Sequence, residues 1–224
     1  MSNNKTKLYK YLSCSTGESK QRVLETIADS KIYLSNGENF NDPFDLLVYD
    51  RYNNTKEKIS NLHILCLTNS YRNSLMWAHY ADSHKGICIT IEVPKDIVYP
   101  VCYSGKVVDK NDNINLLIER SQKSCKRNLQ KDYNGLSFEK KVSLIKSQKW
   151  IYEKEYRILF DDSRGLIINN NDWYMSVKIT ALNLGVKFDN KMNYDLIELC
   201  QEKKIVVKKM ALEHNRYALK SVEL

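Results

Sequence analysis

The sequence has no apolar run long enough to cross a membrane, and residues 1–7 lack the apolar core of a signal peptide. We therefore expect a cytoplasmic protein without a membrane association. Glycine and proline are scarce, with seven and three residues among 224, so long disordered linkers are not expected. A chain of this length can bury about 70% of its unfolded surface without disulfides or metal. We expect a single domain over residues 1–224.

Paired cysteines are also absent, because the six cysteines lie far apart and none belongs to a Cys-x-x-Cys motif. Several lie in apolar stretches, such as 64–67 and 87–89, where a free cysteine behaves as a small buried hydrophobe. We predict reduced thiols in the core. Zinc needs four clustered ligands, which neither His63 near Cys66 nor His84 near Cys88 supplies, so no metal site is predicted.

Several common nucleotide and hydrolase motifs are missing. There is no Walker-type loop, no Gly-x-Gly-x-x-Gly, no His-Glu-x-x-His and no Gly-x-Ser-x-Gly. What the chain has is positive charge, with 35 Lys and Arg against 27 Asp and Glu and a formal net charge of +8. Such a charge raises encounter rates with nucleic acid, although lysines spread along a chain are equally typical of solvated faces.

Hydrophobic patterning predicts more strands than helices. Strands are expected at residues 8–11, 31–35, 63–68, 86–93, 98–103, 155–160, 205–212 and 217–222, with 165–168 and 174–180 extending the sheet. Helices are expected at 19–29, 74–80 and 194–201, and in a long Lys-rich insertion over about 112–148 that is interrupted at Asn134 and Gly135. Strands at both ends of a helical insertion favour an α+β fold with mixed, mainly antiparallel sheets.

Residues 76–80 read Met-Trp-Ala-His-Tyr and form the first candidate site segment. On a helix, Trp77 and Tyr80 share a face while His79 points elsewhere. One interpretation makes the two aromatic residues part of the core. The other makes them the wall of a ligand site, where a planar ring stacks and His79 forms a hydrogen bond with it.

Residues 150–158 form the second candidate segment. If they are a strand, Glu153, Glu155 and Arg157 face the same side. They are then either a solvent-facing ladder of ion pairs or a partly buried trio. Buried ionisable groups are rare unless they are paired, so the second arrangement would mark a functional site.

The third candidate segment is the turn at residues 40–45. Asp42 can cap a helix whose first turn holds Pro43. Alternatively, Asn41 and Asp42 line the same pocket as the other two segments.

Three sequence blocks, NDPFD at 41–45, MWAHYA at 76–81 and WIYEKEYR at 150–157, together resemble a bacterial family of proteins of unknown function numbered 2971. The resemblance spans nearly the whole chain in the same order. The family itself implies no activity.

The opening order of a short aromatic strand, a helix and a strand ending in serine is similar to ADP-ribosyltransferase folds. That similarity implies mainly antiparallel sheets around a cleft that binds NAD. Tyr9 or Tyr11 would occupy the position on the first strand, and Ser35 the position on the second. The chain has no clear His-Tyr-Glu or Arg-Ser-Glu triad at the spacing of those enzymes.

The same similarity implies a glutamate on a late strand. Glu155 or Glu153 would bind the nicotinamide ribose and stabilise the cationic sugar as nicotinamide leaves. Arg157 would hold a pyrophosphate or keep the glutamate ionised.

The leading hypothesis is therefore an NAD-consuming ADP-ribosyltransferase-like enzyme, a bacterial toxin or anti-phage defence effector that modifies nucleic acid or protein. A first alternative is a basic nucleic-acid-binding or nuclease module in which His79, Glu153 and Glu155 do acid–base chemistry. A second alternative is a non-catalytic sensor that binds a small ligand in the aromatic pocket.

Overall fold

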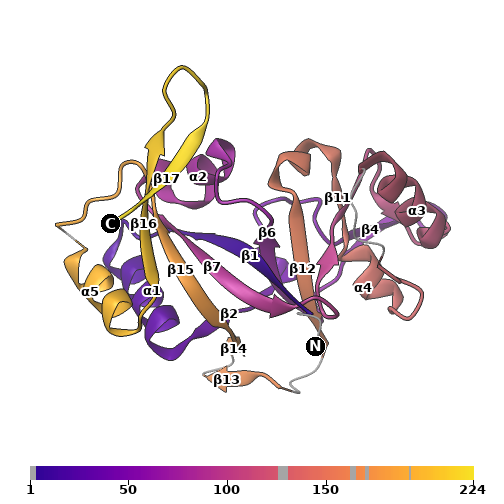
Figure 1. The fold of residues 1–224 in the computed structure, drawn as a ribbon. Helices are drawn as coiled ribbons and strands as arrows, with labels where there is room; N and C mark the ends of the chain where they lie inside the picture. The colour runs from indigo at the N-terminus through magenta and orange to yellow at the C-terminus, as the bar shows by residue number, and fades with distance from the viewer. Residues whose placement is uncertain (1–3, 126–130, 162–164, 170–171, 192) are drawn as a thin grey trace. The chain divides into compact units, whose positions relative to one another are not determined.

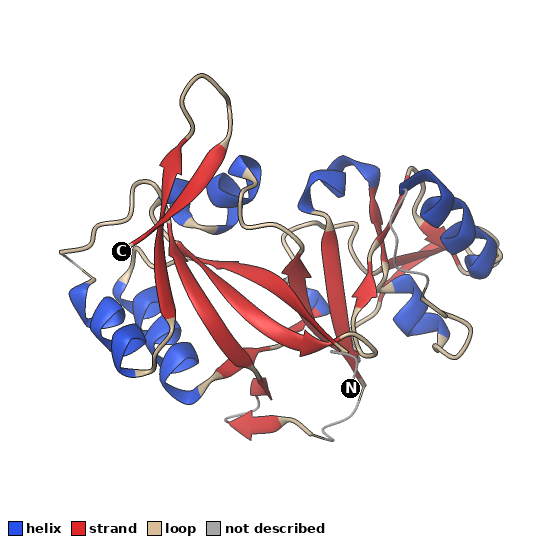
Figure 2. Cartoon of the chain, in the orientation of Figure 1, coloured by secondary structure: helices blue, strands red, loops and turns tan. Residues whose placement is uncertain are grey.

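Helices and mainly antiparallel strands make up the computed structural model, which describes residues 4–125, 131–161, 165–169, 172–191 and 193–224 (Figures 1 and 2). The predicted mixed α+β class is confirmed. Contacts divide the chain into two compact units. Unit 1 comprises Met1–Tyr33, Leu67–Asp96 and Tyr174–Leu224, and unit 2 comprises Leu34–Cys66 and Ile97–Trp173. The single domain over residues 1–224 stays a prediction.

Unit 1 is built on a sheet in which the strands follow the order β17, β16, β15, β7, β1. All neighbours are antiparallel except β15 and β16, which are parallel. The apolar residues of β7 are buried without alternation, as expected of a central strand covered on both faces. The strands of this sheet are β1 (Lys5–Leu12), β7 (Ile87–Pro94), β15 (Lys178–Leu184), β16 (Val206–Leu212) and β17 (Leu219–Glu223).

The helices of unit 1 follow their sequence signals. A capping box of Thr16 and Ser19 starts the first helix, and Val23 and Ile27, four residues apart, are its buried positions. Asn73 caps the second helix through its side chain. These helices are α1 (Gly17–Asp29), α2 (Ser74–Tyr80) and α5 (Tyr194–Glu202), and β2 (Lys31–Tyr33) pairs with β14 (Asp172–Ser176).

Unit 2 consists of short strands around a core of its own. That core consists of the buried residues Leu46, Val48, Ile59, Leu62, Ile64, Cys102, Val108, Ile118, Tyr133, Val142, Leu144 and Ile145. The strands are β3 (Ser35–Asn36), β4 (Leu47–Asp50), β5 (Thr55–Lys58), β6 (His63–Thr68), β8 (Tyr99–Pro100), β9 (Cys102–Ser104), β10 (Val108–Asp109), β11 (Ile145–Ser147), β12 (Glu155–Phe160) and β13 (Ile167–Asn169). The helices are α3 (Ile114–Cys125) and α4 (Phe138–Val142), with 3₁₀ turns η1 (Gly37–Asn39) and η3 (Gln148–Glu153).

The predicted helical insertion over about 112–148 is wrong in its last part. The interruption at Asn134 and Gly135 is confirmed, and Ser137 caps the short helix α4 that follows. Residues 145–147, however, form β11, which pairs in parallel with β9. Tertiary pairing overrides helical propensity there. The strand expected at 98–103 is divided into β8 and β9.

The predicted burial of the thiols in the core is confirmed for Cys14, Cys88, Cys102 and Cys200, whereas Cys66 is partly exposed. The side chain of Cys125 lies outside the described part. Among the described residues, no helix is long and apolar enough to cross a membrane. Nor do His, Cys, Asp and Glu side chains in that part of the chain gather in a group of three that could hold a metal.

Unit 1 contains an unusual left-handed turn, η2 (Asp82–His84), after α2. Asp82, Ser83 and His84 all have positive φ angles, of 47°, 54° and 74°. Each such residue costs roughly 1–2 kcal/mol, so the turn needs external support. The Asp82 carboxylate accepts hydrogen bonds from the Cys14 and Ser15 amides at 2.9 and 3.1 Å, and the His84 carbonyl accepts one from the chain after β15.

This turn leads to a prediction about Gly185. A Cβ atom there would lie 2.1 Å from the His84 carbonyl oxygen, and neither backbone segment can move without breaking its hydrogen bonds. We expect Gly185→Ala to lower the free energy of unfolding by about 1–3 kcal/mol, measured by urea denaturation. Gly17→Ala is the control, because nothing lies within 4 Å of its Cβ. Equal stability of the two variants would contradict the prediction.

Candidate functional site

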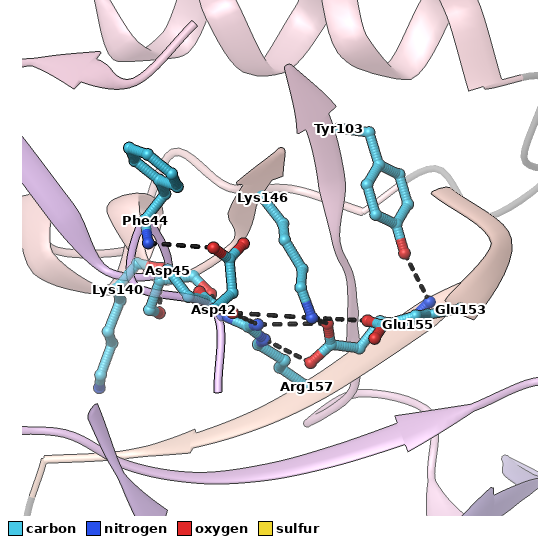
Figure 3. A network of polar contacts seen from close by, with 10 residues as sticks. Asp42, Phe44, Asp45, Tyr103, Lys140, Lys146, Glu153, Glu155 and Arg157 are labelled. Atoms are coloured by element: carbon cyan, nitrogen blue, oxygen red, sulfur yellow. Dashed lines mark hydrogen bonds and ion pairs between the residues drawn. The ribbon is translucent and has the colours of Figure 1, made fainter. Parts of the chain in front are cut away.

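Unit 2 holds a buried network of charged side chains, shown in Figure 3. Its members come from separate segments: a turn before β4, strand β11, turn η3 and strand β12. All have a residue exposure of 7% or less. We call this set the ion network; it consists of Asp45, Lys146, Glu153, Glu155 and Arg157.

Arg157 lies at the centre of the ion network and is fully buried. Its Nη1 and Nη2 atoms donate to Oδ1 and Oδ2 of Asp45 at 2.9 and 2.6 Å, which is a bidentate pair. Nε and Nη2 donate to the Glu155 carboxylate at 2.7 and 3.2 Å, and Nη1 also donates to the Ser143 carbonyl at 2.6 Å. A guanidinium has five N–H donors, and all five are used.

Lys146 is the second cation of the network. Its Nζ atom donates to Oε2 of Glu153 at 2.5 Å and to Oε2 of Glu155 at 3.0 Å, and lies 3.7 Å from Oδ2 of Asp45. It also lies 5.2 Å from the centre of the Trp150 ring, within range of a cation–π contact. One ammonium therefore joins three carboxylates.

The network carries more negative than positive formal charge. Asp45, Glu153 and Glu155 contribute three negative charges, and Lys146 and Arg157 contribute two positive ones. The difference is one negative charge. Burial alone would raise the pKa of Glu155, but the charges of Arg157 and Lys146 and their hydrogen bonds hold it well below its ordinary value. Glu155 is therefore an ionised carboxylate at neutral pH.

The backbone around Glu153 explains this geometry and corrects two expectations. The strand predicted at residues 155–160 is confirmed as β12 (Glu155–Phe160). The condition that all of residues 150–158 form a strand is not met, because η3 extends through Glu153 and Lys154 ends it in a left-handed conformation with a φ of 47°. The strand β12 begins only at Glu155, whose amide donates to the Tyr103 hydroxyl at 2.9 Å. The alternative of a solvent-facing ladder is also wrong, because the side chains are buried.

Asp42 is a further buried carboxylate in this region, close to Asp45 in sequence and seen beside it in Figure 3. Its Oδ1 atom accepts a hydrogen bond from the Phe44 amide at 3.0 Å. Its Oδ2 atom has no hydrogen-bond partner within the described residues. The predicted helix with Pro43 in its first turn is wrong, since residues 43–46 form a turn. Asn41 is exposed.

Of the other predicted site residues, Ser35 belongs to unit 2 and is partly buried on β3, while the rest belong to unit 1. Trp77 is fully buried, donates to the Tyr71 carbonyl at 2.8 Å and meets the Tyr11 ring edge to face. Its interpretation as a core residue is confirmed. Tyr9 and Tyr80 are partly buried, and His79 is exposed. The functional roles assigned to these residues stay predictions.

Sequence reasoning missed Lys146 and Asp45 as members of the network. Lys146 was assigned to a helical insertion, although it follows the apolar residues Leu144 and Ile145, a pattern equally typical of a buried strand. Asp45 lay within the NDPFD block but was given no role. Because its partner Arg157 lies 112 positions away, no local pattern indicates the contact.

The network predicts a large effect of removing its central cation. Arg157→Met would leave Asp45 and Glu155 buried without their main partner, so we expect a loss of about 3–5 kcal/mol in the free energy of unfolding. The control is Arg22→Met, which removes an exposed pair with Glu18 and should change stability by about 0.5 kcal/mol or less. Urea denaturation measures both, and similar losses would contradict the prediction.

The low pKa of Glu155 also predicts a dependence of stability on pH. A carboxylate whose pKa is lowered by folding stabilises the folded state above its ordinary pKa of 4.5, and this stabilisation is lost as the pH falls further towards the folded pKa. We expect the wild-type melting temperature to fall more steeply below pH 4.5 than that of Glu155→Gln. Parallel curves for the two proteins would rule out this linkage.

Comparison with known proteins gives one match. The model of the family described as "Protein of unknown function (DUF2971)" matches residues 76–158, which run from α2 to β12. No curated protein and no solved structure matches the chain. The matched segment contains two of the three sequence blocks that predicted this family, MWAHYA and WIYEKEYR. Residues 76–158, which are less than half of the chain, are therefore similar to the DUF2971 family of proteins of unknown function.

Proposed function

We propose that the protein is an NAD-consuming enzyme of the ADP-ribosyltransferase type, with the carboxylates of the ion network as its electrostatic centre. One observation carries the proposal: the five described residues of the ion network carry one more negative than positive formal charge, and Glu155 is held ionised. A fixed site with excess negative charge favours a cationic reacting group. NAD supplies one, because its nicotinamide ring is a pyridinium.

The chemistry fits such a site. The bond between the nicotinamide nitrogen and the ribose anomeric carbon breaks, and its electron pair leaves with the ring, which becomes neutral. Positive charge then develops on the sugar, where a pre-positioned anion lowers the barrier. An acceptor hydroxyl, amine or guanidinium group of nucleic acid or protein forms the new bond and loses a proton. A second carboxylate is suited to accept that proton.

The contacts of Glu155 define its role within this proposal. Both of its oxygens already accept hydrogen bonds, Oε1 from Arg157 and Oε2 from Lys146 and Arg157. Glu155 therefore acts as a fixed charge whose position is set by two cations. The five Arg157 hydrogen bonds go to Asp45, Glu155 and the Ser143 carbonyl. Glu153, which is bound by Lys146 from the end of η3, is therefore the better candidate for the proton transfer.

Nicotinamide release from NAD tests the proposal, with purified protein alone and with RNA, DNA or lysate protein as acceptor. We expect Glu155→Gln and Glu153→Gln each to lower the rate by about 100-fold or more. Melting temperature is measured in parallel. Glu153→Gln separates catalysis from stability better than Glu155→Gln does, because the five hydrogen bonds of Arg157 go to other residues.

The matched control is Glu57→Gln on the exposed strand β5, which should release nicotinamide at the wild-type rate. No release by folded wild-type protein with any acceptor would overturn the proposal. A folded Glu153→Gln and a folded Glu155→Gln that both keep full activity would overturn the assignment of the site.

A further inference from the structure

A second polar feature of unit 2 lies at the short strand β3. Asn36 pairs with His63 across the antiparallel β3–β6 ladder, so their side chains lie on the same face. The His63 ring is stacked on the Trp173 ring, with centroids 3.8 Å apart and planes within 5°. The Leu34 amide donates to the Trp173 carbonyl at 2.8 Å, which fixes Trp173 beside this strand.

The side-chain oxygen of Asn36 is a hydrogen-bond acceptor whose donor is missing from the described residues. Within the described part of the chain, its Oδ1 atom is buried and receives no hydrogen bond. Native proteins satisfy about 90% or more of such atoms, and an unmet one costs roughly 1–3 kcal/mol. Asn36 precedes η1, yet its side chain makes no capping bond there. None of the contacts above explains the burial of this amide oxygen, and an N–H or O–H donor would satisfy it.

The adjacent ring pair offers the second half of a binding site. Both His63 and Trp173 remain partly exposed, so a further planar ring can extend the stack. Burial lowers the pKa of His63, which keeps its imidazole uncharged at neutral pH. An uncharged ring pair stacks with a neutral or a cationic heterocycle.

We propose that Asn36, His63 and Trp173 bind a planar heteroaromatic ring that carries an N–H donor. The ring extends the His63–Trp173 stack, and its amino or carboxamide group donates to Oδ1 of Asn36. Both ends of NAD have this chemistry, in the amino group of adenine and the carboxamide of nicotinamide. The identity of the ligand as NAD rests on the proposed function, whereas the recognition of the ring does not.

Binding of small probes tests the inference and separates the two ends of NAD. The probes are adenosine, nicotinamide and purine riboside, which keeps the purine ring but lacks the amino group. We expect saturable binding of adenosine or nicotinamide by calorimetry, with quenching of tryptophan fluorescence. If adenosine is the ligand, purine riboside should bind about tenfold more weakly. Trp173→Phe should keep binding but lose the quenching.

Three variants complete the test. Asn36→Ala should weaken binding about fivefold to tenfold, and Trp173→Leu about tenfold or more. Tyr52→Leu, which alters an exposed aromatic residue of unit 2, is the control and should bind as the wild type does. Asn36→Ala should also leave the melting temperature without ligand unchanged or raised, because it removes an unmet acceptor.

Failure of this inference differs from failure of the proposed function. No saturable binding of any probe, or wild-type affinity in both Asn36→Ala and Trp173→Leu, would overturn the ring site even if nicotinamide is released. Ring binding that depends on Asn36 without any nicotinamide release would support the site and overturn the transferase. A lower melting temperature of Asn36→Ala with unchanged affinity would show a structural role instead.

Discussion

The arrangement of the ion network in unit 2 depends on the burial of one guanidinium group, that of Arg157. Removing Arg157 from water is costly, and the cost is offset only because each of its five donors meets an oxygen. These oxygens belong to a turn before β4, to the end of α4 and to β12 itself. The same contacts that satisfy the cation therefore fix three distant segments at one point. Such a network sets geometry more than it adds stability.

The contacts of the ion network both fix the positions of its carboxylates and leave it with a net negative charge. Lys146 and Arg157 determine where the carboxylates lie, and the carboxylates determine that the site remains negative overall. A group held by hydrogen bonds on both oxygens cannot reorient in response to a nearby charge. Its field is then available without the reorganisation that water would require. The aromatic pair at β3 offers a different kind of recognition, based on ring stacking and one acceptor.

Local patterns in the sequence predict much of the fold. Capping residues such as Thr16 and Asn73 mark where α1 and α2 begin, and the apolar runs of β6 and β7 mark buried strands. The candidate site was predicted only in part. Glu155 and Arg157 were identified because two charges of opposite sign recur at strand spacing near aromatic residues.

The remaining site residues depend on contacts that no local pattern encodes. Lys146 becomes part of a site only when β11 pairs with β9, more than 40 positions earlier in the chain. The pairing of His63 with Trp173 spans more than 100 positions. Lys154 takes a left-handed conformation that a lysine side chain does not favour. The end of η3 at Glu153 therefore could not be predicted from the sequence either.

The order of segments has a consequence for synthesis on the ribosome. All of unit 2 has been translated by residue 173, whereas unit 1 still lacks β15, β16 and β17 at that point. Until β15 emerges, the apolar strand β7 has a partner on only one edge. A nascent chain paused there exposes an unpaired, strongly apolar strand, the kind of surface that chaperones bind and that leads to aggregation.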